Sequence, residues 1–197
     1  MSLKLKRLSY KQIGSIADQF LSSYHPSLSL PIPIEEIAEA KLNLEIVPAM
    51  KIKEDFDVDG CLNSDLTGIF IDYDLYMKYE NRTRFTIAHE IGHLIIHEDI
   101  FRSLNIKTAD ELYRLSEKIT SEDYGWLEYQ AYSFAGHALV PTKLLLKEIK
   151  EKLGRIPNKE TPEILFPVLQ DLLSIFQVSG DVMLRRLQKE NIVGLST

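Results

Sequence analysis

Two histidines four residues apart, with a glutamate directly after the first, are the side chains of this sequence best suited to catalysis. They are His89, Glu90 and His93, and they form the HExxH pattern typical of zinc sites. On an α-helix, a step of four residues turns about 400°, so the two imidazoles lie about 40° apart on one face and roughly 6 Å apart along the axis. They can therefore bind one metal ion. Glu90 lies about 100° further round, where its carboxylate can accept a proton from water at the metal without becoming a ligand.

The segment around this pattern, RFTIAHEIGHLIIH at 84–97, is apolar on nearly every side. A helix of this kind is expected to be buried, and we expect Asn81 to cap its start. The two histidines and the glutamate then need partners, because an unpaired polar group inside a protein is costly. They are either core residues satisfied by hydrogen bonds or parts of a metal site. We prefer the metal site, because three polar groups are clustered in a helix that otherwise avoids water.

A third metal ligand is required, because a catalytic zinc ion usually has three protein ligands and a fourth position for water. Glu128 is the candidate, on a second helix predicted at 125–139. Ala131 and Ala135 follow it at i+3 and i+7, and these small residues would let the second helix approach the first closely. The alternative is that Glu128 is a solvated surface residue.

Three other side chains are weaker candidates for the metal site. His97 lies about 12 Å along a continuous helix from His89 and about 80° round it, too far to bind the same ion, and we expect it to end the helix. His137 is nine residues beyond Glu128, about 180° away on the opposite face of an unbroken helix, and we expect a structural role. Cys61 could be an inhibitory zinc ligand, but burial as a small hydrophobic residue is the preferred interpretation.

Hydrophobic periodicity predicts an α+β fold that is mostly helical, with a small mixed β-sheet. Alternation of apolar and polar residues predicts strands at 42–47 and 67–72, and the acidic run at 53–60 is interpreted as a solvated turn. The remaining predicted elements are helices at 10–21 with Ser9 as its cap, 33–40, 109–118, 143–153, 164–176 and 181–190.

The composition is that of an ordinary soluble protein, with 45% hydrophobic residues, 26% charged residues and a formal net charge of -6. The acidic balance argues against non-specific binding to nucleic acid or anionic membranes. One cysteine excludes an internal disulfide and fits a reducing compartment. We recognise no signal peptide and no membrane-spanning run, so we expect a cytoplasmic protein with no membrane partner.

The length fits one domain over 1–197. Within it, we expect 8–45 to supply N-terminal helices, 46–153 to form the core around the metal, and 158–197 to form a C-terminal helical part that is similar to a helix-turn-helix.

Several segments together resemble the ImmA/IrrE-type zinc metallopeptidases. The motifs that carry the resemblance are RFTIAHEIGHLIIH, the ExxA pattern at 128–131 and FAGHALVP. The proline-led PIPIEEIAE, the segment TGIFID and the C-terminal FQVSGDVMLRRLQKENIV extend it over most of residues 10–193.

The resemblance implies a zincin-like, gluzincin-type fold with one zinc ion per chain, bound by His89, His93 and Glu128, and with Glu90 as the general base. Manganese also suits these donors. Members of the family act inside bacteria or in their mobile elements, where they cleave a helix-turn-helix repressor and so derepress genes. The resemblance therefore implies a zinc endopeptidase whose partner is such a repressor, with the substrate extended and adding a strand to the sheet edge provided by 67–72.

Tyr132 departs from the family pattern, in which asparagine is common at this position. It lies four residues after Glu128 and so on the same helix face. Its hydroxyl is a candidate to orient a ligating histidine or to donate to the oxyanion during catalysis. Packing in the core is the alternative.

Two competing functions need to be weighed. In the first, QVSGDVMLRRLQ is a DNA-binding helix-turn-helix in which Arg185, Arg186 and Lys189 contact phosphates. We disfavour it, because the apolar residues between 182 and 187 suit docking into a core and the chain is acidic, so no direct nucleic-acid contact is expected. In the second, the chain is a peptidase fold that only senses a signal or binds a partner. The complete set of candidate catalytic residues argues against this.

Overall fold

The protein is mostly helical with a small mixed β-sheet, which confirms the predicted α+β fold. The computed structural model describes residues 5–63, 65–104, 119–155 and 159–193. The strands are β1 (Glu45–Ala49), β2 (Gly60–Leu62) and β3 (Gly68–Asp72). The helices are α1 (Tyr10–Tyr24), α2 (Ile34–Glu36), the π-helix η1 (Ile37–Lys41), α3 (Ile52–Phe56), α4 (Tyr73–Lys78), α5 (Glu80–Leu104), α8 (Ser121–Leu139), α9 (Thr142–Leu153), α10 (Pro162–Phe176) and α11 (Gly180–Lys189). The helix predicted at 109–118 lies outside the described residues. Among the residues that are described, no helix has the length and apolar character needed to cross a membrane.

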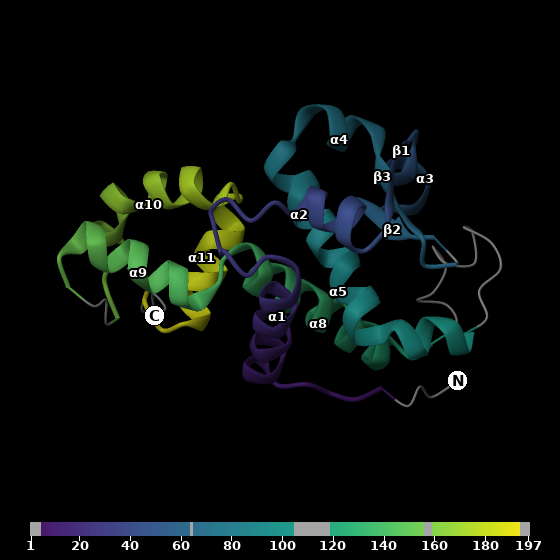
Figure 1. The fold of residues 1–197 in the computed structure, drawn as a ribbon, viewed down its shortest axis with the longest axis horizontal. Coiled ribbons are helices and arrows are strands. Elements are labelled where there is room, and N and C mark those ends of the chain that lie inside the picture. Colours follow the sequence, from purple (N-terminus) through teal and green to yellow (C-terminus); the bar gives the residue numbers. More distant parts are fainter. Residues whose placement is uncertain (1–4, 64, 105–118, 156–158, 194–197) are drawn as a thin grey trace.

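The helices α5 and α8 pack against each other in the middle of the molecule, between the sheet on one side and α9 to α11 on the other (Figure 1). The two helices approach each other closely at Gly92 of α5. A Cβ atom added there would lie 3.1 Å from both the Cα atom and the carbonyl oxygen of Ala131 on α8. The predicted close approach through small residues is therefore confirmed at Ala131. It brings Glu128, almost one turn earlier on α8, to the face of α5 that carries the HExxH pattern.

The sheet has the order β1-β3-β2, with β1 parallel and β2 antiparallel to β3. The two predicted strands are therefore present, but the prediction that 67–72 supplies a free edge is wrong, because β3 is the central strand. The edge beside α5 is β2 instead. The acidic run at 53–60 is also not a plain turn, since it contains most of α3 and the first residue of β2. A strand of three residues is too short to show a recognisable alternation of apolar and polar residues.

The central helix α5 extends beyond the predicted range at both ends. Asn81 lies inside the helix and its side chain donates to the carbonyl oxygen of Val178 at 3.4 Å, so its predicted role as a cap is wrong. His97 does not end the helix, which continues to Leu104. The apolar run marks only the most buried part of α5, in which Ile95 is nevertheless exposed, whereas the end turns of the helix are polar.

The predictions for the outer helices agree more closely with the structure. Ser9 caps α1 as predicted, with its Oγ accepting from the backbone N–H of Gln12 and the Gln12 side chain accepting from the backbone N–H of Ser9. The buried side of α1 packs against α8. The helix α9 ends at Gly154, whose φ of 70° favours glycine.

Candidate metal centre

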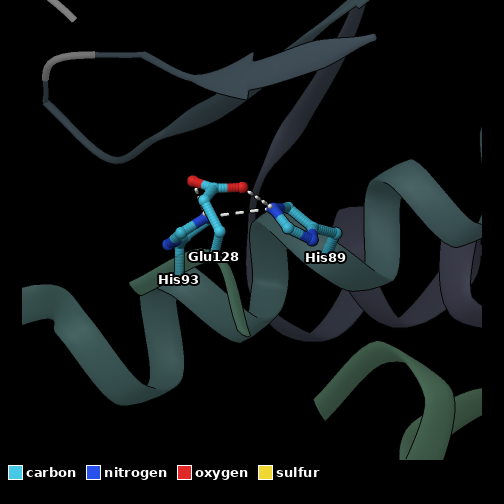
Figure 2. A group of neighbouring side chains, drawn as sticks. All are labelled: His89, His93 and Glu128. Atoms are coloured by element: carbon cyan, nitrogen blue, oxygen red, sulfur yellow. Dashed lines mark hydrogen bonds and ion pairs between the residues drawn. The ribbon is translucent and has the colours of Figure 1, made fainter. Parts of the chain in front are cut away.

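The donor atoms of His89, His93 and Glu128 come together between α5 and α8 (Figure 2). The two Nε2 atoms are 3.0 Å apart, and the carboxylate oxygens of Glu128 lie 3.3 Å from His89 Nε2 and 3.4 Å from His93 Nε2. In the described part of the chain, no other group of three or more His, Cys, Asp or Glu residues could hold a metal ion. The structure thus places all three predicted ligands in one cluster.

The spacing and chemistry of these donors fit a divalent metal ion such as zinc. Two ligands about 2.0–2.1 Å from zinc at a tetrahedral angle lie about 3.3 Å apart, close to the 3.0, 3.3 and 3.4 Å separations found in the cluster. Two imidazoles and one carboxylate also leave the fourth position that a catalytic site needs. The Glu128 side chain is 38% exposed, but its carboxylate faces both histidines, which argues against the surface alternative.

The electrostatics of the cluster favour a cation. Burial alone would raise the pKa of Glu128, but the ion pairs with His89 and His93 outweigh it and hold this pKa well below its usual range. Burial would likewise lower the pKa of His89, but Glu128 and Glu90 together raise it above its ordinary value. The two carboxylates therefore stabilise positive charge at the imidazole nitrogens. A metal ion bound there would supply that positive charge.

Glu90 lies beside the cluster, on the side of α5 that faces the sheet. Its Oε2 accepts a hydrogen bond from the backbone N–H of Leu62 in β2 at 2.9 Å, and the residue is only 6% exposed. It does not belong to the donor cluster. This is the placement expected of a proton acceptor next to a metal. The contribution of Leu62 was not anticipated from the sequence, because β2 itself was not.

His97 is buried against His93, one turn further along α5. It is 1% exposed, and its Nδ1 lies 3.2 Å from Nδ1 of His93. Burial and the neighbouring His93 lower the pKa of His97 to about 3, so it is neutral and not the cation expected at a helix end. It is not among the clustered donors, in agreement with the helical geometry.

A cavity of about 380 Å³ lies over the donor atoms. One wall is the edge strand β2 and the opposite wall is formed by α5 and α8, with aromatic side chains at Phe85, Phe101, Tyr124 and Tyr132. Cys61 also lines it and is half-buried, so its expected burial holds only in part. The side chains of the donor cluster line this cavity.

The ring of Tyr132 packs in the cavity wall. Its centroid is 4.8 Å from that of Phe85, and the guanidinium of Arg185 lies 4.9 Å from it. Among the described residues, its hydroxyl makes no hydrogen bond to His89 or His93. These contacts are those of a residue that packs in the core, which was the alternative to a catalytic role. The catalytic role of Tyr132 stays a prediction.

Tyr124 is a second tyrosine of the cavity, and sequence reasoning missed it. Burial, followed by the charges of Glu128 and Glu90, raises its pKa to about 12, so its hydroxyl is neutral, and the residue lines the same cavity as both carboxylates. It precedes Glu128 by four residues and therefore lies on the same helix face. This four-residue spacing from Glu128 is the feature of the sequence that could have identified Tyr124 as a residue of the cavity.

His137 lies away from the cluster, as its position on α8 predicts. It is 6% exposed, and its ring centroid is 4.4 Å from that of Tyr10 on α1. Burial, with the nearby charge of Arg186, lowers its pKa to about 3. The structure gives it the contacts of a packing residue.

Of the three basic residues of α11 that could contact phosphates, Arg186 is buried, whereas Arg185 and Lys189 are exposed. Arg186 is 3% exposed and donates to the carbonyl oxygen of Val140 and to the carboxylate of Glu190. The guanidinium of Arg185 packs over Tyr132, and the ammonium of Lys189 lies 5.7 Å from the ring centroid of Tyr10. Arg186 is therefore a structural residue that joins α11 to the end of α8.

The fold and the His, His and Glu cluster are those expected of a metal-dependent peptidase, and comparison with known proteins identifies the family. A family model described as the IrrE N-terminal-like domain, a family of peptidases, matches residues 69–188. The matched segment covers more than half of the chain and includes the whole donor cluster. The chain therefore belongs to this family.

Among solved structures, a Mycobacterium tuberculosis transcriptional regulator has a similar fold, with a TM-score of 0.56 and 15% sequence identity. The similarity covers 90% of this chain and 46% of that regulator, so the chain spans less than half of the larger protein. At this identity the likeness shows the fold alone. No curated protein matches the chain.

Proposed function

We propose that the protein is a zinc-dependent endopeptidase that hydrolyses a peptide bond in a partner protein. The observation that carries this proposal is the cluster of His89, His93 and Glu128 with a buried carboxylate, Glu90, beside it in one cavity. A zinc ion held by His89, His93 and Glu128 would polarise the scissile carbonyl and lower the pKa of water towards about 7.

Glu90 is the proposed general base and proton shuttle. The hydrogen bond from Leu62 N–H holds Oε2 at 2.9 Å and so orients the carboxylate. Oε1 then accepts a proton from the attacking water and afterwards delivers it to the leaving amine. Because Glu90 is buried and is not one of the clustered donors, its loss should separate catalysis from metal binding.

The edge of β2 is the proposed binding site for the substrate backbone. In the antiparallel pairing with β3, the backbone groups of alternate residues form the ladder, and those of Gly60 and Leu62 point away from it. Leu62 N–H is taken by Glu90, which leaves the N–H and C=O of Gly60 and the C=O of Leu62 for an added strand. A peptide paired there has its backbone directly beside Glu90.

The proposed partner is a helix-turn-helix transcriptional repressor, whose cleavage would derepress its genes. The support is the sequence resemblance to ImmA/IrrE-type peptidases and the membership of the family. The proposed location is the cytoplasm, where such a repressor acts.

The test combines metal analysis with a cleavage assay on the purified chain. Wild-type protein should hold about one equivalent of zinc, and His93→Ala should lose it. Glu90→Gln should keep the metal and cleave about 10²–10⁴-fold more slowly. The substrates are the repressor encoded beside the protein and a library of peptides derived from a bacterial proteome.

The matched control is His25→Ala, which removes a loop histidine whose Nε2 bonds to the Ser29 carbonyl and which lies outside the cluster. It should equal wild type in both metal content and cleavage. Unchanged zinc in His93→Ala would refute the ligand assignment, and cleavage by metal-loaded Glu90→Gln at close to the wild-type rate would refute the role of Glu90.

A further inference from the structure

His97 is a buried histidine that the proposed reaction does not use. It lies four residues after His93 on α5 and is 1% exposed. The two rings are neighbours, with centroids 5.3 Å apart, and their Nδ1 atoms are 3.2 Å apart. The nitrogen of His93 that faces the donor cluster is the other one, Nε2.

The distance between the Nδ1 atoms determines which ring nitrogens carry hydrogen. Two nitrogens 3.2 Å apart form a hydrogen bond only if one carries a hydrogen and the other presents a lone pair. When His93 binds a metal through Nε2, that nitrogen has no hydrogen, so the hydrogen of the neutral ring is on Nδ1. His93 is then the donor, and Nδ1 of His97 is the acceptor.

We propose that His97 is a positioning residue for the metal site: its Nδ1 accepts the hydrogen bond from His93 Nδ1–H and so fixes the tautomer and ring orientation in which His93 Nε2 faces the metal. This inference rests on the proposed function, because it concerns the same metal ligand. Metal-binding histidines generally donate their second ring nitrogen to a partner that orients them. Here the partner comes from the same helix, one turn away.

A second observation separates this role from simple packing. If His97 accepts at Nδ1, its own hydrogen is on Nε2, and Nε2 is buried with no hydrogen-bond partner among the described residues. A buried N–H without a partner destabilises a fold. An apolar side chain of similar size would therefore suit the position better if packing were the whole role of His97.

The test measures zinc affinity in chains with different side chains at position 97. His97→Leu and His97→Phe remove the acceptor and keep an apolar side chain of comparable bulk. His97→Asn places an amide oxygen as many bonds from Cα as Nδ1 is in histidine, so it keeps an acceptor near the same place. The matched control is His137→Leu, because His137 is also a buried histidine with an unpartnered Nε2 but touches no ligand of the cluster.

Each chain is stripped with a chelator and titrated with Zn²⁺ in competition with a chromophoric chelator. We expect about 10–100-fold weaker binding for His97→Leu and His97→Phe, with most of the affinity restored in His97→Asn and wild-type affinity in His137→Leu. Thermal unfolding of the metal-free proteins should show that His97→Leu is at least as stable as wild type. Ring ¹⁵N spectra of the zinc-loaded wild type should show His93 protonated at Nδ1 and His97 at Nε2.

Wild-type affinity in His97→Leu or His97→Phe would overturn the inference, and so would equal losses in His97→Leu and His97→Asn, because the acceptor would then not matter. A ring proton on Nδ1 of His97 would overturn it as well. If the wild-type chain itself bound no zinc, the proposed function would fail together with the inference. Failure of His97 alone, with zinc bound by the wild type and lost in His93→Ala, would leave the proposed function standing.

Discussion

Replacing His137 by leucine should make the metal-free protein less sensitive to acid. His137 is 6% exposed and packs so closely against α1 that a Cβ atom on Gly14 would lie 2.8 Å from its ring. The charged side chain that acts on it is Arg186, which is itself buried. A proton added to the imidazole would therefore create a second buried cation. Burial and this charge lower the pKa of His137 from 6.5 to about 3.

The sign and size of the effect follow from this shift. Between the two pKa values, 6.5 in the unfolded chain and about 3 in the folded protein, the unfolded state binds a proton at His137 and the folded state does not. The stabilisation is thus complete above the unfolded-state pKa and is lost as the pH falls towards the folded-state pKa. From pH 7 to pH 5, the loss in the free energy of unfolding is about 2 kcal/mol. The figure depends little on the folded-state pKa, because both pH values lie well above it.

Urea denaturation at pH 7 and pH 5, in the presence of EDTA, measures the effect in wild type and in His137→Leu. EDTA keeps metal binding out of the comparison. His97, whose pKa is also lowered to about 3, is present in both proteins and cancels in the difference between them. Wild type should lose about 2 kcal/mol more than the variant between the two pH values. Equal losses would show that folded His137 takes up its proton freely, which would refute the argument from burial.

Two further perturbations test the packing that supports the site. Gly92→Val should weaken zinc binding and destabilise the fold by about 1–3 kcal/mol, because the added Cβ atom would lie 3.1 Å from the Ala131 backbone and force α5 and α8 apart. The control is Gly125→Ala, because a Cβ atom at Gly125 has nothing within 4 Å. In urea denaturation, this control should stabilise the protein by up to about 1 kcal/mol. Arg186→Met should cost about 3–5 kcal/mol by the same measurement, because it leaves the Glu190 carboxylate without its buried partner. A surface phosphate contact at Arg186 would instead show almost no loss of stability.

The parts of the site that lie on one helix could be predicted from the sequence, because helical spacing is a local property. The positions of His89, Glu90 and His93 follow from the geometry of a single element. The prediction of Glu128 as a ligand required a further assumption, that small residues let a second helix approach the first. The close approach of Gly92 to Ala131 supports that assumption.

The parts that depend on pairing between distant segments could not be predicted. The strand β2 has three residues and follows an acidic run, so neither its composition nor its periodicity indicates a strand. Its position at the edge depends on pairing with β3, and its contact with Glu90 depends on the packing of the sheet on α5. The family resemblance therefore implied a substrate edge at 67–72, because the sequence pattern indicates that strand and does not indicate β2.

The same limit explains the arginine of α11. An arginine on an amphipathic helix looks the same in sequence whether its guanidinium meets solvent or the core. Arg186 is buried because the carbonyl of Val140, where α8 ends, and the carboxylate of Glu190 lie within reach of it. Only the folded chain supplies the carbonyl, so the sequence could disfavour phosphate contacts by α11 as a whole but could not show that Arg186 itself is a structural residue.

Each polar side chain of the HExxH pattern on α5 contacts a polar group that lies outside the five-residue pattern. His89 and His93 face Glu128 from α8, Glu90 receives the N–H of Leu62 from β2, and His93 contacts His97. An apolar helix that carried these polar groups without such partners would bear a large desolvation cost. The partners are what make the pattern compatible with burial, and burial keeps the carboxylates and imidazoles close enough to act on one metal ion. The integrity of the proposed peptidase site therefore depends on the packing of β2 and α8 on α5 as much as on the HExxH residues themselves.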